Sequence, residues 1–296
     1  MLLAVVILFF LGWACRSRFA VPAPLLVWAD RYVINIALPS VIIAKVSQVD
    51  ITAKSGIPIA AAWSSMAVCA LVIVLLGRQL KWPNSRVGAL LLVGVLGNTS
   101  FLGIEVVRTL LGDDHVAAAV AYDQIGTFLA LSLYGTWIAG KYGSSDVGWR
   151  PIMRRISRFT PFVALVVSFG LRTIDLPTEL ISFLNGVGKS VAPVAMGVLG
   201  ARFTFRWSEQ NKRTVLGVLG LKMIVVPAAL LLVAIMAGDI HSAEWSASVL
   251  QSAAPPMVTA GIVAISAGFD EELVVSIVGL GTLLSIVSLP LFSLVM

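Results

Sequence analysis

The side chains that could do chemistry in this chain lie inside long apolar stretches. The stretch GNTSFLG, residues 97–103, places Asn98, Thr99 and Ser100 about halfway along a run that otherwise has the composition of a membrane-spanning helix. Amide and hydroxyl groups can hydrogen-bond a polar ligand, but a polar group left unpaired in a bilayer costs free energy. These groups must therefore be satisfied by other protein groups or by a ligand.

A second interruption occupies the matching position in the other half of the chain. Sliding the second half over the first at an offset of about 156 residues aligns Gly112 with Gly268 and sets Pro255 and Pro256 against residues 99–100. Proline lacks a backbone donor and disfavours helical geometry at the residue before it. Both aligned segments are therefore expected to break a helix at the same depth.

Composition places these segments in a membrane. The chain has 296 residues, of which 58% are hydrophobic and 12% charged, with a mean hydropathy of +0.97. So few charges cannot cover a water-soluble surface, so we expect an all-α integral membrane protein with no sizeable soluble domain. Ten helices are predicted, near residues 2–14, 25–46, 57–77, 87–111, 115–139, 159–172, 180–200, 213–237, 246–267 and 272–295.

The basic residues predict the orientation of these helices. Connections after odd-numbered helices hold 14 Lys or Arg residues: Arg16, Arg18, Arg78, Lys81, Arg86, Lys141, Arg150, Arg154, Arg155, Arg158, Arg202, Arg206, Lys212 and Arg213. Connections after even-numbered helices hold four: Lys45, Lys54, Arg108 and Arg172. The positive-inside rule makes the odd connections cytoplasmic and puts both termini outside the plasma membrane. The net charge of +6 reflects this loop bias, and no aromatic-interleaved basic patch indicates nucleic-acid binding.

Five helices per half predict two inverted repeats, residues 1–156 and 157–296, because an odd number of spans turns the second copy over. This plan is typical of secondary transporters, whose broken helices direct half-helix N-termini into a shared cavity. Such a cavity suits a carboxylate. We therefore predict crossover helices 4 and 9 broken at mid-membrane, with Asn98, Thr99, Ser100, Pro255 and Pro256 binding substrate. The alternative is a close-packed seam of small residues on one helix and an ordinary proline kink on the other.

Charged residues inside the predicted spans need a partner or a function. Asp123, with Gln124 beside it, is about nine residues into the fifth helix, roughly 13 Å deep. It could bind a coupling H⁺ or Na⁺, or form a structural ion pair. Lys222 could attract an anionic substrate or mimic a bound cation, although an ion pair with Asp123 or Glu105 is favoured. Glu105 is also three residues before Arg108, a spacing that predicts an ion pair at the outer mouth.

Other roles are less sharply indicated. Asn35, before Pro39 in the second helix, could contact substrate from the opposite side or make an interhelical hydrogen bond. An intramembrane enzyme would need a Ser/His, HExxH or paired-Asp constellation, and the predicted spans hold none of these. No metal or cofactor site is indicated. A membrane receptor that binds a small anion without transporting it is the alternative to a transporter.

Several motifs together resemble a known family. GNTSFLGI followed by GDDHVAAAVAYDQIG, and AAPPMVTAGIVA before GFDEELVVSIVGLGTLLSIVSLPL, are similar to the crossover regions of the auxin efflux carrier family. VINIALPSVI and LKMIVVPAAL resemble that family's second and eighth helices. Only about 20 residues separate Tyr142 from Pro161, so the long cytoplasmic loop of the plant carriers is missing, as in bacterial members. The family's crossover asparagine corresponds to Asn98, whereas Glu105 stands where the family usually has proline.

The resemblance implies a fold and an activity. Its fold, akin to that of the bile-acid symporters, has a scaffold of helices 1, 2, 6 and 7 and a transport unit of helices 3–5 and 8–10. It implies an elevator-like movement of small carboxylates, such as auxin in plants and malate or malonate in bacteria. It also implies a homodimer through the scaffold helices. Proton symport, sodium symport and uniport all remain open.

Overall fold

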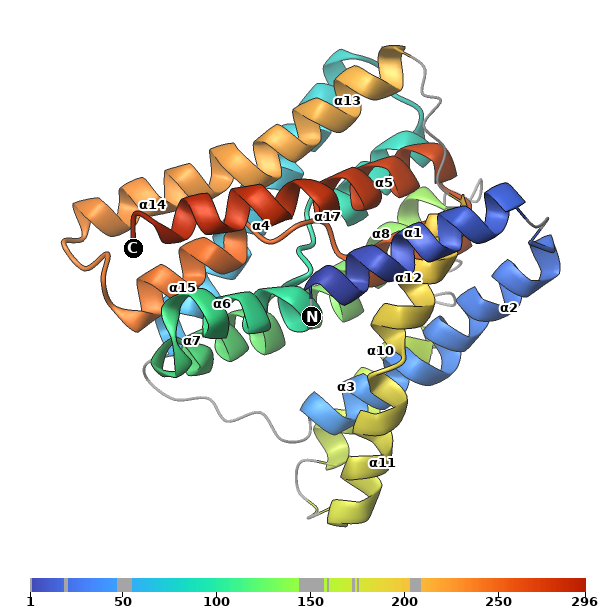
Figure 1. Cartoon of the computed structure of the whole chain (residues 1–296), viewed down its shortest axis with the longest axis horizontal. Coiled ribbons are helices and arrows are strands. Elements are labelled where there is room, and N and C mark those ends of the chain that lie inside the picture. The colour runs from blue at the N-terminus through green and yellow to red at the C-terminus, as the bar shows by residue number, and fades with distance from the viewer. Residues whose placement is uncertain are drawn as a thin grey trace.

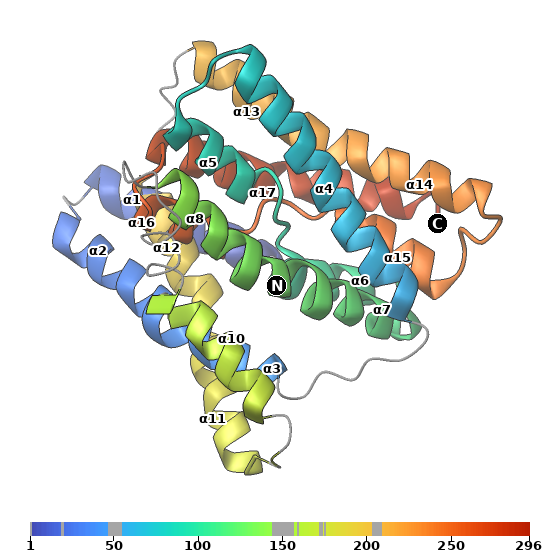
Figure 2. The same cartoon turned by 180° about the vertical axis from the view of Figure 1, so that it is seen from behind.

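The computed structural model describes residues 2–18, 21–46, 55–143, 157–158, 160–171, 174, 176–202 and 209–296. In these ranges the regular elements are all helical. The helices form two groups, seen from opposite sides in Figures 1 and 2. The first, here called the flanking group, consists of α1 (Leu2–Arg18), α2 (Ala23–Tyr32), the π-helical turn η1 (Val33–Ala37), α3 (Leu38–Val46), α10 (Thr160–Leu171), α11 (Thr178–Gly188) and α12 (Val191–Arg202).

The second group, here called the crossing group, surrounds the two interrupted segments. Its first half comprises α4 (Gly56–Gln79), α5 (Asn84–Val93), η3 (Thr99–Gly103), α6 (Ile104–Leu111), η4 (Asp113–His115), α7 (Val116–Ala121), η5 (Tyr122–Phe128), η6 (Leu131–Gly135) and α8 (Thr136–Tyr142). Its second half comprises α13 (Glu209–Gly220), η7 (Leu221–Val225), α14 (Val226–Met236), α15 (Ala243–Ser252), α16 (Val258–Ser266) and α17 (Glu271–Ser293). Every range in which a helix was predicted contains helix in the described residues.

In the described part of the chain, six helical stretches are long and apolar enough to cross a membrane. They span Ala23–Ala44, Gly56–Gln79, Asp113–Tyr142, Thr178–Arg202, Asn211–Met236 and Glu271–Ser293. Three shorter apolar helices, Ile7–Arg16, Asn84–Val93 and Thr160–Leu171, accompany them. The chain is therefore a multi-pass membrane protein, as its composition predicts, while the arrangement as two inverted repeats stays a prediction.

The two predicted interruptions are present, and they meet. Helical structure stops between α5 and η3, and again between α15 and α16. The unwound segments, residues 94–98 and 253–257, are joined by an antiparallel bridge between Gly97 and Pro256, by Asn98 N–H donating to Pro255 O at 2.7 Å, and by Met257 N–H donating to Leu96 O at 2.9 Å. Each segment thus pairs with backbone groups of the other that have no partner in a helix. This pairing makes irregular backbone tolerable away from water.

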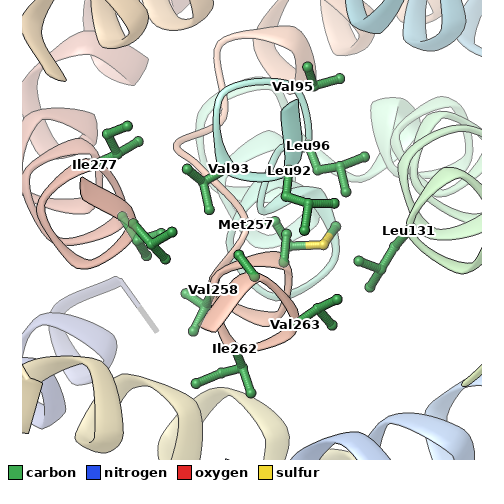
Figure 3. Close-up of a cluster of buried hydrophobic side chains, with 14 of the residues drawn as sticks. Leu92, Val93, Val95, Leu96, Leu131, Met257, Val258, Ile262, Val263 and Ile277 are labelled. Carbon is green, nitrogen blue, oxygen red and sulfur yellow. The ribbon is translucent and has the colours of Figure 1, made fainter. Parts of the chain in front are cut away.

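Apolar side chains enclose this crossing. Leu92 of α5 and Leu96 of the first segment pack beside Met257 and Leu131, with Ile277 of α17 nearby (Figure 3). These five side chains are at most 5% exposed. Such packing fixes the relative positions of the two segments.

Prolines explain two of the π-helical turns. η1 and η7 each end two residues before a proline, Pro39 and Pro227 respectively. A helical proline lacks the N–H that would bond the preceding turn, and its ring crowds that turn, so the helix widens there. π-helical turns are frequent at functional sites, and Asn35 and Lys222 lie in these two.

The loops predicted to share one side of the membrane gather at one end of the molecule. The contacts that join them are Arg16 with Ala201, Gly88 with Phe269, Gly143 with Ala267, Arg202 with Glu271, and Asn211 with Glu272. At the other end, His241 Nδ1 lies 2.7 Å from Met296 O. This grouping agrees with the predicted alternation of loops, and the side of the membrane that each end faces stays a prediction.

Candidate functional site

Asp123 is enclosed about ten residues into the helical stretch Asp113–Tyr142, which follows α6. It lies in η5, and its side chain is fully buried. Its Oδ1 accepts hydrogen bonds from Thr99 Oγ1 at 2.7 Å and Ser100 Oγ at 2.5 Å, while its Oδ2 accepts from Gln124 Nε2 at 2.8 Å. Thr99 Oγ1 also lies 2.6 Å from Thr127 Oγ1. The carboxylate is therefore solvated by hydroxyl and amide groups.

Lys222 lies on the other side of the break. It is 4% exposed, and its ammonium Nζ donates to Val95 O at 3.1 Å, just past the last residue of α5. Nζ also lies close to Gly97, since a Cβ added at that glycine would be 3.4 Å from it. The lysine is therefore buried against the backbone of the crossing.

These positions correct the predicted ion pair between Lys222 and Asp123 or Glu105. Among the ion pairs of the described residues, none includes Lys222 or Asp123. Carbonyls at a helix C-terminus carry partial negative charge, and N–H groups at an N-terminus carry partial positive charge. Lys222 therefore complements the C-terminal end of α5, and Asp123 the N-terminal end of the helical segment beginning at Thr99. Each charge is matched to one end of the same broken helix.

Three polar atoms near the crossing have no hydrogen-bond partner among the described residues. They are Asn98 Nδ2, Gln124 Oε1 and Gln251 Oε1, on side chains that are 2%, 7% and 1% exposed. Buried polar atoms in native proteins are nearly always paired, so unpaired ones indicate a ligand or a bound water. Asn98 Nδ2 is a donor suited to an anionic oxygen, whereas the two glutamine oxygens are acceptors.

A cavity lies inside the crossing group beside Lys222. Its lining comes from α4, η3, η5, η7, α14, α15 and the crossing itself: Ser65, Met66, Cys69, Val95, Gly97, Thr99, Tyr122, Thr127, Lys222, Val226, Gln251 and Ser252. Gln251, four residues before Pro255, was not among the predicted site residues. Its Nε2 donates to Ala119 O at 3.0 Å and Thr99 O at 3.4 Å, which ties α15 to both η3 and α7. An amide inside an apolar run, one turn before the paired prolines, is the sequence signal that could have identified it.

Two predicted site residues lie apart from this cluster. Asn35 is exposed, and its Oδ1 accepts from Thr160 Oγ1 of α10 at 2.7 Å. Glu105 pairs with Arg108 at 2.7 Å, which confirms the predicted i,i+3 ion pair, and both side chains are partly exposed. The structure therefore gathers Asn98, Thr99 and Ser100 with the two prolines and with the Asp123 and Lys222 regions, but neither Asn35 nor Glu105 joins them.

A buried charge cluster in the flanking group was also missed. Arg202 donates from Nη1 to Asp30 Oδ1 at 3.1 Å and from Nη2 to Asp30 Oδ2 at 2.8 Å. Asp30 falls within the second predicted helix, 25–46, so its position in an apolar segment was the available signal. Its partner is 172 residues away in the sequence, and no local spacing identifies it.

Comparison with known proteins agrees with these features. The family model described as "Membrane transport protein" matches residues 1–293. An uncharacterized transporter of Methanothermobacter thermautotrophicus is 27% identical over 279 residues, which cover 90% of this chain and 88% of the relative. An uncharacterized transporter of Methanocaldococcus jannaschii is 28% identical over 181 residues, 58% of each chain. Because the family model matches nearly the whole chain, the chain belongs to the membrane transport protein family, which is the family of the auxin efflux carriers.

Proposed function

We propose that the protein is a secondary transporter that moves a small carboxylate across the membrane by alternating access. In this proposal the crossing group carries the substrate and moves, elevator-like, against the flanking group. The crossing group corresponds to the transport unit, and the flanking group to the scaffold, that the family resemblance implies. Among the described residues, the boundary between the groups is formed by α1, α10, α12 and η1 on one side and α16, α17 and η6 on the other, and the crossing group would shift along it.

The unpaired amide of Asn98 is the observation that carries the proposal. Its Nδ2 is a buried donor, without a hydrogen-bond partner in the described part of the chain, at the point where the two broken helices cross. The helical segments that begin at Thr99 and Val258 start at the same point, so their N-terminal ends add partial positive charge. A carboxylate would accept from Asn98 and be stabilised by both helix ends.

Asp123 is the proposed site of ion coupling. The carboxylate is buried, it accepts three side-chain hydrogen bonds, and the unpaired Gln124 Oε1 belongs to the neighbouring residue. Oxygen groups of this kind can hold a proton or a Na⁺ ion. Because Asp123 bonds Thr99 and Ser100, which follow Asn98 directly, ion binding there would alter the geometry of the carboxylate site.

The inverted repeat is part of the same proposal. Gly112 and Gly268, which the repeat aligns, both have positive φ angles, 102° and 78°, at helix ends where a side chain would be strained. Two equivalent turns at opposite ends of the crossing group are what an inverted repeat requires. With the basic loops on the cytoplasmic side of the plasma membrane, the end that holds Arg202 faces the cytoplasm.

Flux measurements on purified protein test the proposal. The protein would be reconstituted in liposomes and given a panel of radiolabelled mono- and dicarboxylates under an imposed pH or Na⁺ gradient. Accumulation of one of these anions above the level in empty liposomes is the expected result. Saturable binding without flux would instead support a receptor, and neither binding nor flux of any carboxylate would contradict the substrate class.

A further inference from the structure

Arg202 connects the two groups of helices through unequal contacts. Its two Nη atoms hold both oxygens of Asp30, which lies in α2 of the same flanking group. Its Nε lies 3.0 Å from Glu271 Oε1, at the first residue of α17 in the crossing group. The guanidinium therefore bonds one carboxylate in each group and uses all three of its nitrogen atoms.

Burial determines which of these contacts can open. The Arg202 and Asp30 side chains are 8% and 7% exposed, whereas that of Glu271 is 53% exposed. Separating Arg202 from Asp30 would leave two buried charges uncompensated, which is strongly unfavourable. Separating Arg202 from Glu271 leaves an exposed carboxylate that water can solvate. Any movement between the groups would therefore break the Glu271 contact first.

The main chain of Arg202 is also held by α1. Arg16 of α1 donates from Nη1 to Ala201 O at 3.1 Å and to Arg202 O at 3.0 Å, at the C-terminal end of α12. A cation there satisfies carbonyls that the helix leaves unpaired. α1 packs closely on α12, because a Cβ added at Gly200 would overlap Phe9 O. Contacts within the flanking group thus hold Arg202 in place independently of its bond to Glu271.

We propose that Arg202 is a gate residue for transport, and that its bond to Glu271 is a latch holding the crossing group in the arrangement seen here. Arg202 stays with Asp30 throughout the cycle, and Glu271 leaves it when the crossing group moves. This inference rests on the proposed movement of one group against the other. It adds a residue that sets the balance between the two end states and does not touch substrate.

Glu271→Gln and Glu272→Gln form a matched pair of variants. Glu272 is the next residue of α17, but its Oε1 accepts from Asn211 Nδ2 of α13 at 2.9 Å, within the crossing group. Both changes remove one partly exposed charge from the same helix turn, and only the first weakens a contact between the groups. Arg202→Ala would leave Asp30 unpaired and is expected to impair folding, so it is not the deciding variant.

Electron spin resonance distances would report the result. Spin labels at Phe183 of α11 and Met236 of α14, which are 67% and 80% exposed, mark one position in each group. Cys15 and Cys69 would be replaced by alanine in this background, and its flux checked. We expect wild type to show two distances, one from the arrangement described here and one from the shifted arrangement. Glu271→Gln should lower the ratio of the first population to the second about 1.5- to 5-fold. Glu272→Gln should match wild type, and the effect of Glu271→Gln should shrink at high salt.

The outcomes separate this inference from the proposed function. Two distances in wild type with unchanged populations in Glu271→Gln would overturn the latch and leave the moving unit intact. Equal shifts in both variants would also overturn it, since the effect would then come from net charge. A single narrow distance in wild type at every salt, pH and Na⁺ concentration would contradict the movement itself, and the latch with it.

Discussion

Lys222 and Asp123 contact opposite ends of one broken helix and do not contact each other. Lys222 Nζ donates to Val95 O after α5, and Asp123 accepts from Thr99 and Ser100 where the helix resumes. In a continuous helix these N–H and C=O groups would bond each other. The break leaves them as partially charged helix ends, and each of the two residues stabilises one end. The charge pattern is therefore a consequence of the crossing.

Replacing Lys222 should destabilise the protein, and charge exchange should not repair it. Lys222→Met keeps the length of the side chain but leaves Val95 O without its donor, which costs about 1–3 kcal/mol. The Lys222→Asp/Asp123→Lys double variant would place each charge at the wrong helix end and is expected to be less stable than either single variant. Thermal unfolding in lipid nanodiscs measures this. Recovery of wild-type stability or flux in the double variant would restore the ion-pair interpretation.

Asp123→Asn should uncouple transport from the ion gradient. Asparagine keeps an oxygen that can accept from Thr99 and Ser100, but it can neither take up a proton at neutral pH nor supply a charge to Na⁺. Exchange of substrate between equal concentrations should continue, while accumulation driven by a pH or Na⁺ gradient should be lost. Thr127→Val removes a neighbouring hydroxyl without changing charge and should keep its gradient dependence. If accumulation by Asp123→Asn still depended fully on the ion gradient, the coupling role of Asp123 would be excluded.

Gly281→Ala should disturb the crossing directly. A Cβ at this position in α17 would be 2.5 Å from Pro256 Cδ and 2.9 Å from Leu219 Cδ2, so the crossing segment or the helix must shift. Overpacking of this kind costs about 1–3 kcal/mol. Gly217→Ala is the matched control, because no atom lies within 4 Å of its added Cβ and alanine favours the helix. A melting temperature equal to or above wild type for Gly281→Ala would show that the crossing is less tightly packed than described.

Asp30→Asn should be far more harmful than Glu105→Gln. The first change removes the buried carboxylate that pairs with the guanidinium of Arg202 and leaves it only the exposed Glu271, at a cost of about 3–5 kcal/mol. The second removes a partly exposed i,i+3 pair, worth at most about 1 kcal/mol. Yield of monodisperse protein and its melting temperature, compared in one detergent, would check the order. Similar losses for the two variants would contradict the difference in burial on which the gate inference depends.

Sequence pattern predicted the backbone better than the side-chain contacts. The breaks at residues 94–98 and 253–257 were predictable because glycine, small polar residues and paired prolines act locally, within one helical turn. Helix positions followed equally from hydropathy and from the prolines and glycines that end each run.

Contacts between helices were not predictable in the same way. Whether Asp123 faces Lys222 or Thr99 depends on helix rotation, and the π-helical turns η5 and η7 change that rotation. The pairing of Asp30 with Arg202 depends on the packing of α2 against α12, for which a single sequence holds no direct signal. The Glu105 pair was predictable because both partners lie on one helix turn.

Carboxylate uptake by Asn98 variants tests the central claim most directly. Initial rates would be measured in proteoliposomes for wild type, Asn98→Ala, Asn98→Asp and Ser132→Ala, the last removing a buried hydroxyl that donates to Phe128 O of its own helix. Loss of a hydrogen bond to a charged group costs about 1.5–3 kcal/mol, so Asn98→Ala should reduce uptake at low substrate concentration about 10- to 100-fold. Asn98→Asp should reduce it further by repelling the anion, while Ser132→Ala stays close to wild type. Wild-type uptake by correctly folded Asn98→Ala protein would show that the carboxylate does not bind at the crossing.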